Sequence, residues 1–372
     1  MPRLILGLSL DALGASRLPE LMAAAGCEIT LVCGRGLAIS SSGDVSHRIL
    51  TERSATAVRD AIERTVACDP QGYDRVILAD EPLLRAFVDR PPSPALARIT
   101  PQVASIPRLE RQLSKISFSI DAADAGIPVP DYRVLENPAE LATEKWDGKP
   151  FVVKRDHGFS GGGVFVIRSK AELEEAKAGI GSGRLLLQEF VAGRVGATAI
   201  LMDHGRPSAW YSYYLCRNWP NGISPASALE PCWQPGMEAI LVKLGKMTGF
   251  DGLCGIDWVF DESSGRLLVL ELNPRPTPGM NASRLVGVSF PSALAHWLKG
   301  ELFRQAPTQA GTPMYRLFPQ NLFRSIADRD IVEFFRTWKD APFRSPMLLF
   351  ALLRRVLTHH LPPALRRSNT SN

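Results

Sequence analysis

The segment GIDWVFDESSGRLLVLELNPRP, residues 255–276, decides the fold of this chain. Two apolar runs flank the polar turn 261–265, which predicts a β-hairpin. Asp257 lies on the first strand, and Glu271 and Asn273 point to one face of the second because they are two residues apart. Taken singly, a turn hydrogen bond for Asp257 and an ion pair for Glu271 are the simpler interpretations. Together, costly carboxylates among apolar residues favour a Mg²⁺ site.

A second segment, KRDHGFSGGGVFVI at residues 154–167, carries a glycine-rich loop between apolar runs. The runs 150–156 and 162–169 predict two strands, so the loop is the tip of a hairpin. Glycine lets backbone N–H groups approach phosphate oxygens, and Lys154 places a cation beside them. Ordering three consecutive glycines costs about 1 kcal/mol each relative to alanine. The loop therefore favours phosphate binding over a purely structural tip.

Two other phosphate or nucleophile motifs fit this loop poorly. Residues 158–162 match GxSxG, which would make Ser160 a nucleophile, but that elbow must open a helix, and a strand follows here. The GxxxxGK[ST] phosphate loop is absent from the sequence. A serine hydrolase using Ser160 stays a remote alternative.

Taken in chain order, the segments of this sequence resemble those of the ATP-grasp superfamily. The resemblance is to the carboxylate–amine or carboxylate–thiol ligase type, with a fold like those of carbamoyl-phosphate synthase and biotin carboxylase. The resemblance runs from about Lys115 to the segment PGMNASRLV and covers roughly half of the chain. Residues 113–132 resemble the helix with the first ATP lysine, 150–167 the strand with the second lysine and its mobile glycine loop, and 185–193 the hinge at the adenine. Residues 255–276 resemble the metal-binding hairpin.

The resemblance implies a set of site residues. Expected to bind ATP are Lys115, Lys154, Ser160, Gly161, Gly162, Gly163, Gln188, Glu189, Phe190 and Val191. Expected to hold two Mg²⁺ ions, with Mn²⁺ as a substitute, are Asp257, Glu271 and Asn273. The family usually has a ribose-binding glutamate after the hinge, where this chain has Val195. Because of this departure, the sequence leaves open whether Val195 impairs the use of ATP.

The resemblance also implies the reaction, in which ATP phosphorylates a carboxylate and an amine displaces the phosphate to give an amide, ADP and phosphate. Arg275 and Lys154 are the expected catalytic residues. The guanidinium fork of Arg275 matches an acyl phosphate, and the ammonium group of Lys154 is expected beside the phosphates of ATP. Arg284 and Arg217 are expected to bind the substrates, and ion pairing at the surface is the alternative. An ATP-binding protein without ligase turnover is the second hypothesis.

The resemblance and the strand–helix alternation of the first hundred residues together predict an α/β protein. A Rossmann-like parallel α/β domain is expected at 1–105, without a GxGxxG fingerprint, and a two-lobed α+β ATP-grasp domain at 106–300, with a glycine-loop lobe at about 115–187 and a metal-binding lobe at about 188–300. Residues 89–102 are proline-rich and predict a linker, and 108–126 predict one helix. A basic, mostly helical extension is expected at 301–372.

Composition limits the class of protein. The chain has 372 residues, a net charge of +5 and 45% apolar residues, which is typical of a globular protein and too weakly basic to imply nucleic acid. No cysteines form a CxxC pair, which predicts a reducing cytoplasm. Asp11 interrupts the apolar start, so a first strand is expected there rather than a signal peptide.

The C-terminal residues mix apolar and arginine side chains and contain no acid from 341 to 372. Such a tail can lie on an anionic membrane surface, and the alternative is a helix that docks on the protein body or on a second subunit. A homodimer and a peripheral membrane contact through the tail are both left open. The expected partners in the reaction are a small carboxylate and an amine.

Overall fold

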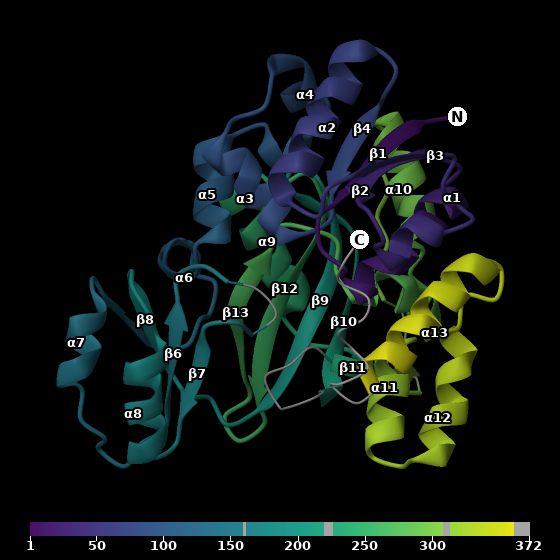
Figure 1. Cartoon of the computed structure of the whole chain (residues 1–372). Helices are drawn as coiled ribbons and strands as arrows, with labels where there is room; N and C mark the ends of the chain where they lie inside the picture. The colour runs from purple at the N-terminus through teal and green to yellow at the C-terminus, as the bar shows by residue number, and fades with distance from the viewer. Residues whose placement is uncertain (159–160, 219–225, 308–312, 361–372) are drawn as a thin grey trace.

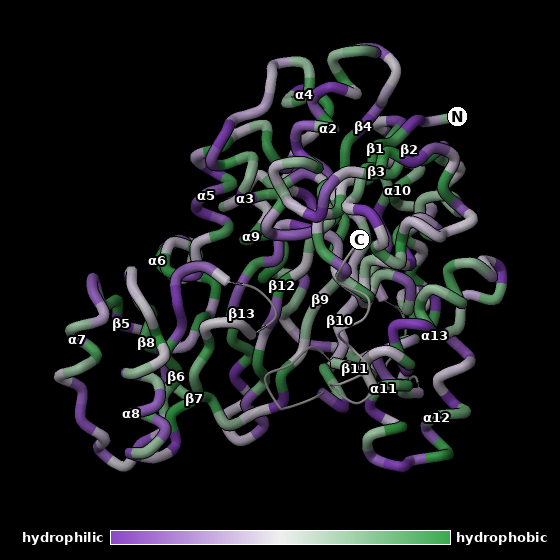
Figure 2. The backbone as a smooth tube through the Cα atoms, viewed as in Figure 1, coloured by the Kyte–Doolittle hydropathy of each residue, from purple (hydrophilic) through white to green (hydrophobic). Residues whose placement is uncertain are grey.

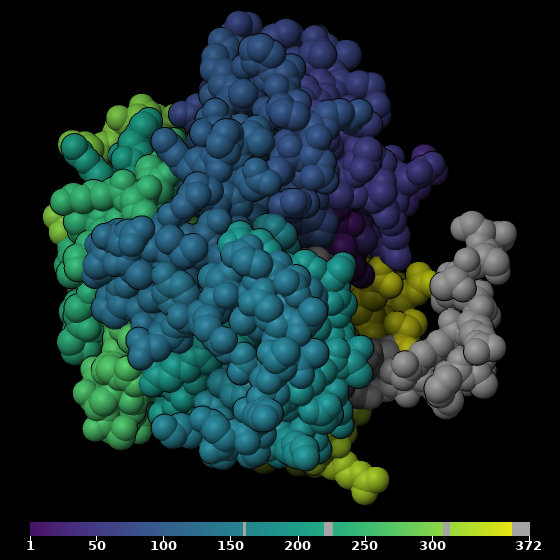
Figure 3. Space-filling view, turned by 90° about the vertical axis from the view of Figure 1, so that its left-hand side faces the viewer, coloured from purple at the N-terminus to yellow at the C-terminus, as the bar shows by residue number. Residues whose placement is uncertain are grey.

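The computed structural model describes residues 1–158, 161–218, 226–307 and 313–360. Three β-sheets with their covering helices share these residues, and Figure 1 shows the N-terminal sheet above the two others. In Figure 3 the N-terminal part, in purple and blue, sits on top of the lobe that carries the glycine loop. Figure 2 shows hydrophobic segments along the central strands and hydrophilic ones in many of the peripheral loops.

The N-terminal sheet is parallel, with strand order β3-β2-β1-β4. The alternation expected from the sequence is confirmed, and the structure adds β3, a short and mostly exposed edge strand without a strong apolar signal. The apolar residues of β1 and β2 fill the cores on both faces of the sheet, as buried parallel strands do. The elements are β1 (Arg3–Leu8), η1 (Leu13–Arg17), α1 (Leu18–Ala24), β2 (Glu28–Gly34), η2 (Ala38–Ser41), β3 (His47–Thr51), α2 (Ala55–Cys68), β4 (Arg75–Leu78) and α3 (Glu81–Asp89).

Two details of the following segment differ from expectation. The proline-rich stretch 89–102 is not an open linker, because α4 (Pro94–Ile99) and η3 (Pro101–Val103) form there and bury Leu96. The single helix expected at 108–126 is two helices, α5 (Ile106–Leu113) and α6 (Lys115–Asp124). Ser114 separates them with extended dihedral angles and caps α6 by accepting a hydrogen bond from the Ser117 N–H group.

The glycine loop belongs to an antiparallel sheet with order β5-β8-β6-β7. Strands β6 and β7 pair directly, so the predicted hairpin is confirmed. Two helices accompany this sheet, and Leu173 and Ala176 of the longer one lie in its core. The elements are β5 (Tyr132–Leu135), α7 (Pro138–Thr143), β6 (Phe151–Arg155), β7 (Val164–Ile167), α8 (Lys170–Gly179) and β8 (Leu185–Glu189).

The third sheet has six strands in the order β13-β12-β9-β10-β11-β14 and contains the predicted carboxylate hairpin as β12 and β13. The register places Asp257 directly opposite Glu271, and a bulge follows between Asp257 and Trp258. The elements are β9 (Arg194–Asp203), β10 (Arg206–Asn218), β11 (Ala226–Cys232), α9 (Met237–Thr248), β12 (Gly252–Asp261), β13 (Arg266–Asn273), η4 (Pro278–Val286), α10 (Phe290–Lys299) and β14 (Tyr315–Arg316).

The C-terminal helices gather at one corner of the molecule, at the lower right of Figure 1. They are α11 (Gln320–Ala327), α12 (Ile331–Thr337), η5 (Trp338–Asp340) and α13 (Pro346–His360). Arg17 forms a buried ion pair of 3.0 Å with Asp340, and Ser345 accepts a hydrogen bond from the Gly43 N–H group. The extension therefore docks on the N-terminal part of the chain. The predicted domain boundaries themselves stay a prediction.

Gln102 joins the N-terminal sheet to the carboxylate hairpin. Its side-chain oxygen accepts from the Leu78 N–H group at 2.8 Å, and its amide nitrogen donates to the carbonyl oxygens of Leu78 at 3.0 Å and Pro274 at 2.9 Å. Pro274 directly follows Asn273, so this buried side chain fixes where the hairpin ends relative to β4.

We expect Gln102→Ala to lower the free energy of unfolding by about 2–3 kcal/mol, because it leaves the buried Leu78 N–H group without a partner. Denaturant unfolding followed by circular dichroism measures the loss. Gln71→Ala, at an exposed position, is the matched control and should change stability by less than about 0.5 kcal/mol. If the Gln102→Ala variant were as stable as this control, the Gln102 side chain would not hold the hairpin against β4.

Candidate functional site

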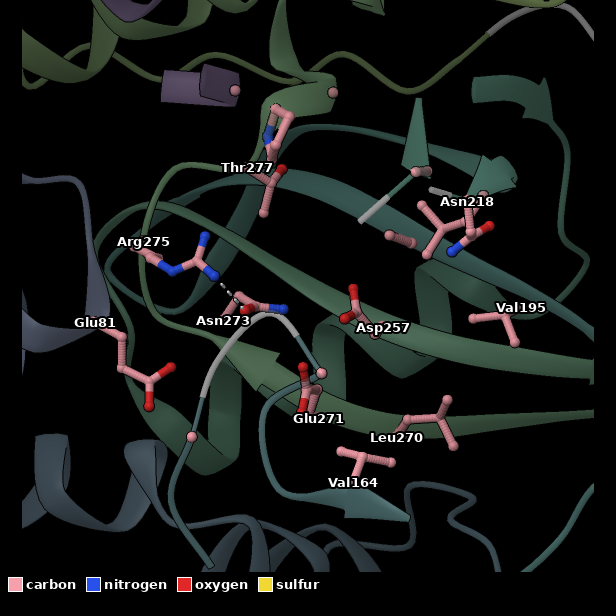
Figure 4. Close-up of a pocket in the computed structure, with 18 of the residues that line it drawn as sticks. Glu81, Val164, Val195, Asn218, Asp257, Leu270, Glu271, Asn273, Arg275 and Thr277 are labelled. Carbon is pink, nitrogen blue, oxygen red and sulfur yellow. Dashed lines mark hydrogen bonds between the residues drawn. The ribbon is translucent and has the colours of Figure 1, made fainter. Parts of the chain in front are cut away.

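A cavity of about 1230 Å³ lies where the three sheets meet. Its walls include Lys115 and Lys154, the hinge residues 188–191 of the second sheet, and Asp257, Glu271 and Asn273 of the third. Figure 4 shows the three predicted metal ligands turned toward one another inside it. Positions far apart in the sequence therefore converge on one cavity.

The two lysines meet the carboxylates at the bottom of this cavity. Lys115 opens α6, and its ammonium nitrogen lies 3.6 Å from a carboxylate oxygen of Glu271 and donates to the carbonyl oxygen of Gly158 at 2.5 Å. Lys154, at the end of β6, is only 7% exposed. Burial, and to a smaller extent the neighbouring Lys115, lower the pKa of Lys154 to about 8.

The surroundings shift the pKa values of the two carboxylic acids in opposite directions. Burial, and then the neighbouring Glu271, raise the pKa of Asp257 to about 8. Burial alone would also raise the pKa of Glu271, but Lys115 and Lys154 outweigh it and hold that pKa below its usual value. Two acidic groups that face each other in this way attract a cation, since a cation favours the charged form of both. The oxygen donors of Asp257, Glu271 and Asn273 fit Mg²⁺.

Arg275 lies beside these ligands. Its guanidinium donates to the side-chain oxygen of Asn273 at 3.1 Å, the contact drawn as a dashed line in Figure 4. The side chain is partly exposed and lines the cavity. The guanidinium is therefore next to the carboxylate hairpin and open to a ligand.

The glycine loop is tied to the start of α6. The Asp156 side chain accepts from Ser114 at 2.6 Å and from the Ile116 N–H group at 3.1 Å, and His157 contacts the Leu113 carbonyl oxygen at 3.1 Å. Gly163 has φ +82°, and a Cβ there would lie 2.8 Å from the Arg155 side chain, so a side chain is excluded. Of the predicted loop residues Gly161 lines the cavity, and Ser160 lies outside the described residues.

At the hinge, Gln188, Glu189, Phe190 and Val191 all line the cavity. The Gln188 amide nitrogen is buried and has no hydrogen-bond partner among the described residues. The Glu189 carboxylate instead pairs with Arg266 at 2.8 Å. The Glu189 side chain is thus paired within the protein, whereas the Gln188 amide nitrogen has no hydrogen-bond acceptor among the described residues.

Val195 also lines the cavity and is 44% exposed. The neighbouring Arg194 is engaged within the protein, because its guanidinium binds Glu230 at 2.6 Å and lies 3.6 Å from the centre of the Tyr214 ring. Figure 4 shows Val195 below Asn218, which lies at the end of β10. The wall at this point is mostly apolar, with Leu215, Val259 and Leu270 among its residues.

The two predicted substrate arginines lie elsewhere. Arg217 has φ +55°, donates to Asn321 at 3.1 Å and faces Asp328 and Asp330 of the C-terminal helices at 3.6 and 3.8 Å. Arg284 lies on η4 and is exposed. Neither is among the residues that line the cavity. Their predicted roles have no support in this geometry.

Several residues that line the cavity were not predicted from the sequence. Asp11, Asp80 and Glu81 follow the carboxyl ends of β1 and β4, and Leu317 and Gln320 come from the C-terminal part of the chain. The rule that ligands bind beyond the carboxyl ends of parallel strands was the available signal for the first three. The last two had no local signal, because tertiary docking alone brings them to the cavity.

No protein-family model matches the chain. The N5-carboxyaminoimidazole ribonucleotide synthase of Synechococcus elongatus is 31% identical over 211 residues, which are 51% of this chain and 49% of that protein. The D-alanine–D-alanine ligase of Paramagnetospirillum magneticum is 27% identical over 54% of this chain and 69% of that protein. This chain thus matches about half the length of the first relative.

Solved structures of the same kind share the fold. The N5-carboxyaminoimidazole synthetase of Staphylococcus aureus, solved with ADP, superposes with a TM-score of 0.66 at 12% identity, over 88% of this chain and 85% of that one. The L-amino acid ligase of Bacillus licheniformis gives 0.55 at 17% identity, over 80% and 74%.

The chain resembles ATP-grasp enzymes in sequence and shares their fold. The resemblance found in the sequence and the predicted fold class are therefore confirmed. The roles of the individual ATP-grasp site residues stay predictions. None of the helices in the described part of the chain combines the length and apolar character that a bilayer span requires.

The arginines around Glu333 give a stability prediction. Arg316 binds Glu333 with two hydrogen bonds of 2.7 and 2.8 Å, and this pair, followed by Arg336, lowers the pKa of Glu333 to about 2. A folded pKa below the ordinary value of 4.5 gives stability that is present above pH 4.5 and lost as the pH falls toward 2.

We therefore expect Glu333→Gln to cost roughly 2 kcal/mol at neutral pH, and the gap to wild type to narrow as the pH falls through this range. Urea unfolding at a series of pH values measures it, with the exposed Glu52→Gln as control. A gap that does not change with pH would show that Glu333 is not held by its arginines.

Proposed function

We propose that this protein is an ATP-dependent ligase that joins a carboxylate to an amine and releases ADP and phosphate. The observation that carries the proposal is the convergence of Lys115 and Lys154 with Glu271 and Asp257 at the bottom of one cavity. Cations placed beside carboxylate oxygens, with a glycine loop at their side, suit a metal-bound polyphosphate. The relatives named as synthases and ligases support the same class of reaction.

Asp257, Glu271 and Asn273 would hold Mg²⁺, and we propose two ions, with Mn²⁺ as a substitute. The metal would offset negative charge on the transferred phosphoryl group. The raised pKa of Asp257 supports this assignment, because a bound cation would offset the burial and the repulsion from Glu271 that raise it.

In the proposed reaction, a carboxylate oxygen of the substrate attacks the terminal phosphorus of ATP, and the bond to the ADP oxygen breaks. The amine nitrogen then attacks the acyl carbon, loses a proton, and phosphate leaves. Lys115 and Lys154 would balance the charge of the phosphates, and the N–H groups of the glycine loop would bind their oxygens. Arg275, beside Asn273, would hold the acyl phosphate in position through its guanidinium fork.

The hinge residues 188–191 would meet the base of the nucleotide at the outer part of the cavity. The carboxylate and amine would bind in the same cavity, whose walls also include Glu81 of the N-terminal part and Gln320 of the C-terminal part. We propose that Gly161 to Gly163 bind phosphate with their backbone. We also propose a cytoplasmic location, in keeping with six free thiols, and leave a homodimer as a hypothesis.

Product analysis tests the ligase. The protein is incubated with Mg-ATP and a small-molecule cell extract, beside Glu271→Gln, and nucleotides and adducts are identified by mass spectrometry. We expect ADP and a new condensed product with wild type, and a loss of at least about 100-fold in the variant. Glu262→Gln, in the exposed turn of the same hairpin, is the matched control and should keep full turnover.

Other outcomes identify the other hypotheses. AMP in place of ADP would contradict the acyl-phosphate route. Tight nucleotide binding without any product would favour an ATP-binding protein without ligase turnover. Val195, in place of the usual ribose-binding glutamate, is the residue that motivates this hypothesis. Ester cleavage that Ser160→Ala abolishes would be required of the serine hydrolase.

Arg275→Ala should lower kcat by about 100-fold while nucleotide affinity stays within about threefold, because the guanidinium acts on the transferred group rather than on bound ATP. Steady-state kinetics together with calorimetric titration of ADP separates the two quantities. Arg275→Lys keeps the charge without the fork and should recover only part of the loss. Arg64→Ala, on an exposed part of α2, is the control, and unchanged kcat in Arg275→Ala would overturn the role.

A further inference from the structure

The outer surface of the C-terminal helices is unusually apolar. Eight of the fourteen large apolar side chains that are exposed in the described part of the chain fall between residues 326 and 357. Most of these eight are more than half exposed, and they are Ile326, Ile331, Val332, Phe335, Phe343, Met347, Phe350 and Leu357. Single exposed apolar residues are ordinary, but a cluster of this density marks a contact surface.

Helix α13 has two apolar faces with different surroundings. Leu348, Leu352 and Val356 are buried in the core that the extension shares with the N-terminal part. Met347, Phe350 and Leu357 follow one another at helical spacing on the opposite face and are 66–68% exposed. Packing of α13 on the protein body therefore explains why Leu348, Leu352 and Val356 are apolar. It does not explain the exposed apolar side chains of the opposite face.

The exposed face continues from α13 toward α12 through aromatic contacts. Phe335 packs against Phe334 with ring centres 5.5 Å apart, and Phe334 against Trp338 at 6.2 Å. Trp338 stacks on Phe343 at 6.3 Å, four residues before Met347. Phe335 and Phe343, both more than 60% exposed, are thus linked through the half-buried rings of Phe334 and Trp338. Figure 2 places α12 and α13 in the same corner of the molecule.

The exposed charges of this surface are mostly of one sign, and the exposed acid at its edge, Asp328, pairs with Arg324 at 2.8 Å. Every exposed charged side chain in the described residues 331–358 is basic: Arg336, Lys339, Arg344 and Arg354. The two acids of this stretch are buried and neutralised, Glu333 by Arg316 and Asp340 by Arg17. Arg354 lies on the exposed face of α13, four residues after Phe350. The sequence from 359 to 372 adds Arg366 and Arg367 and no acid.

We propose that the face of α12 and α13 formed by Phe335, Phe343, Met347, Phe350 and Leu357 with its four basic residues binds the surface of an anionic bilayer. Protruding apolar side chains enter the boundary between head groups and acyl chains, and the flanking arginine and lysine side chains bind lipid phosphates. A second copy of this chain fits less well, because a symmetric contact would bring the same four cations together. The inference is independent of the ligase proposal.

The surface adjoins the catalytic cavity through α11. Gln320 begins this helix and lines the cavity, and α11 packs against α12. Helix α11 therefore lies between the cavity and the helices that carry this surface.

Sedimentation with vesicles tests the proposal on the full chain. Phosphatidylcholine vesicles are compared with vesicles that also contain phosphatidylglycerol, at low and high salt. We expect binding to the anionic vesicles that high salt weakens, and a fall of about tenfold or more in the partition coefficient of the triple variant Phe335→Ser, Phe343→Ser, Phe350→Ser. Leu302→Ser with Val242→Ser removes two exposed apolar side chains elsewhere and should bind like wild type.

Circular dichroism and ADP titration of each variant show that folding and the nucleotide site are intact. Equal sedimentation of the triple variant and wild type, or equal binding to both kinds of vesicle, would overturn the proposal. So would an absence of vesicle binding together with a dimer in analytical ultracentrifugation that the triple variant dissociates, since this face would then be a subunit interface. A loss of vesicle binding in the triple variant, with unchanged ligase turnover in solution, would support the proposal.

Discussion

The charge cluster at the bottom of the cavity is the constraint on which this structure depends. Asp257 and Glu271 face each other across two paired strands, and Lys115 and Lys154 are held beside them with little access to water. Buried charges of this kind are costly, and the two lysines offset the charge of Glu271, whereas burial and Glu271 raise the pKa of Asp257. The four residues come from α6, β6, β12 and β13, so the elements that carry them must meet in one arrangement.

Several contacts outside the cavity serve that arrangement. Gln102 ties the segment after β13 to the N-terminal sheet, and Asp156 ties the end of β6 to the start of α6. The cavity therefore forms only when the three sheets dock together. This also explains why residues of the N-terminal sheet and of the C-terminal part, such as Glu81 and Gln320, take part in its walls.

Much of the site could be predicted from the sequence because its signals are local. The period-two spacing of Glu271 and Asn273, and the glycine run after Lys154, each report backbone geometry within a few residues. The direction of Arg217 could not be predicted in this way. Its side chain is turned toward Asn321 and Asp328, about a hundred residues away, and no pattern near residue 217 encodes that contact. The break at Ser114 was missed because the apolar spacing continues across it, although serine is a good helix cap.

The central claim is that Asp257, Glu271 and Asn273 hold the metal of a bound nucleotide beside the two lysines. A crystal structure with Mn²⁺ and a non-hydrolysable ATP analogue tests it most directly, because the anomalous signal of manganese locates the ions. The account predicts manganese peaks in contact with the oxygens of these three side chains, with Lys115 and Lys154 on the phosphates. A bound nucleotide whose metal lies away from Glu271, or whose phosphates do not reach the lysines, would contradict it.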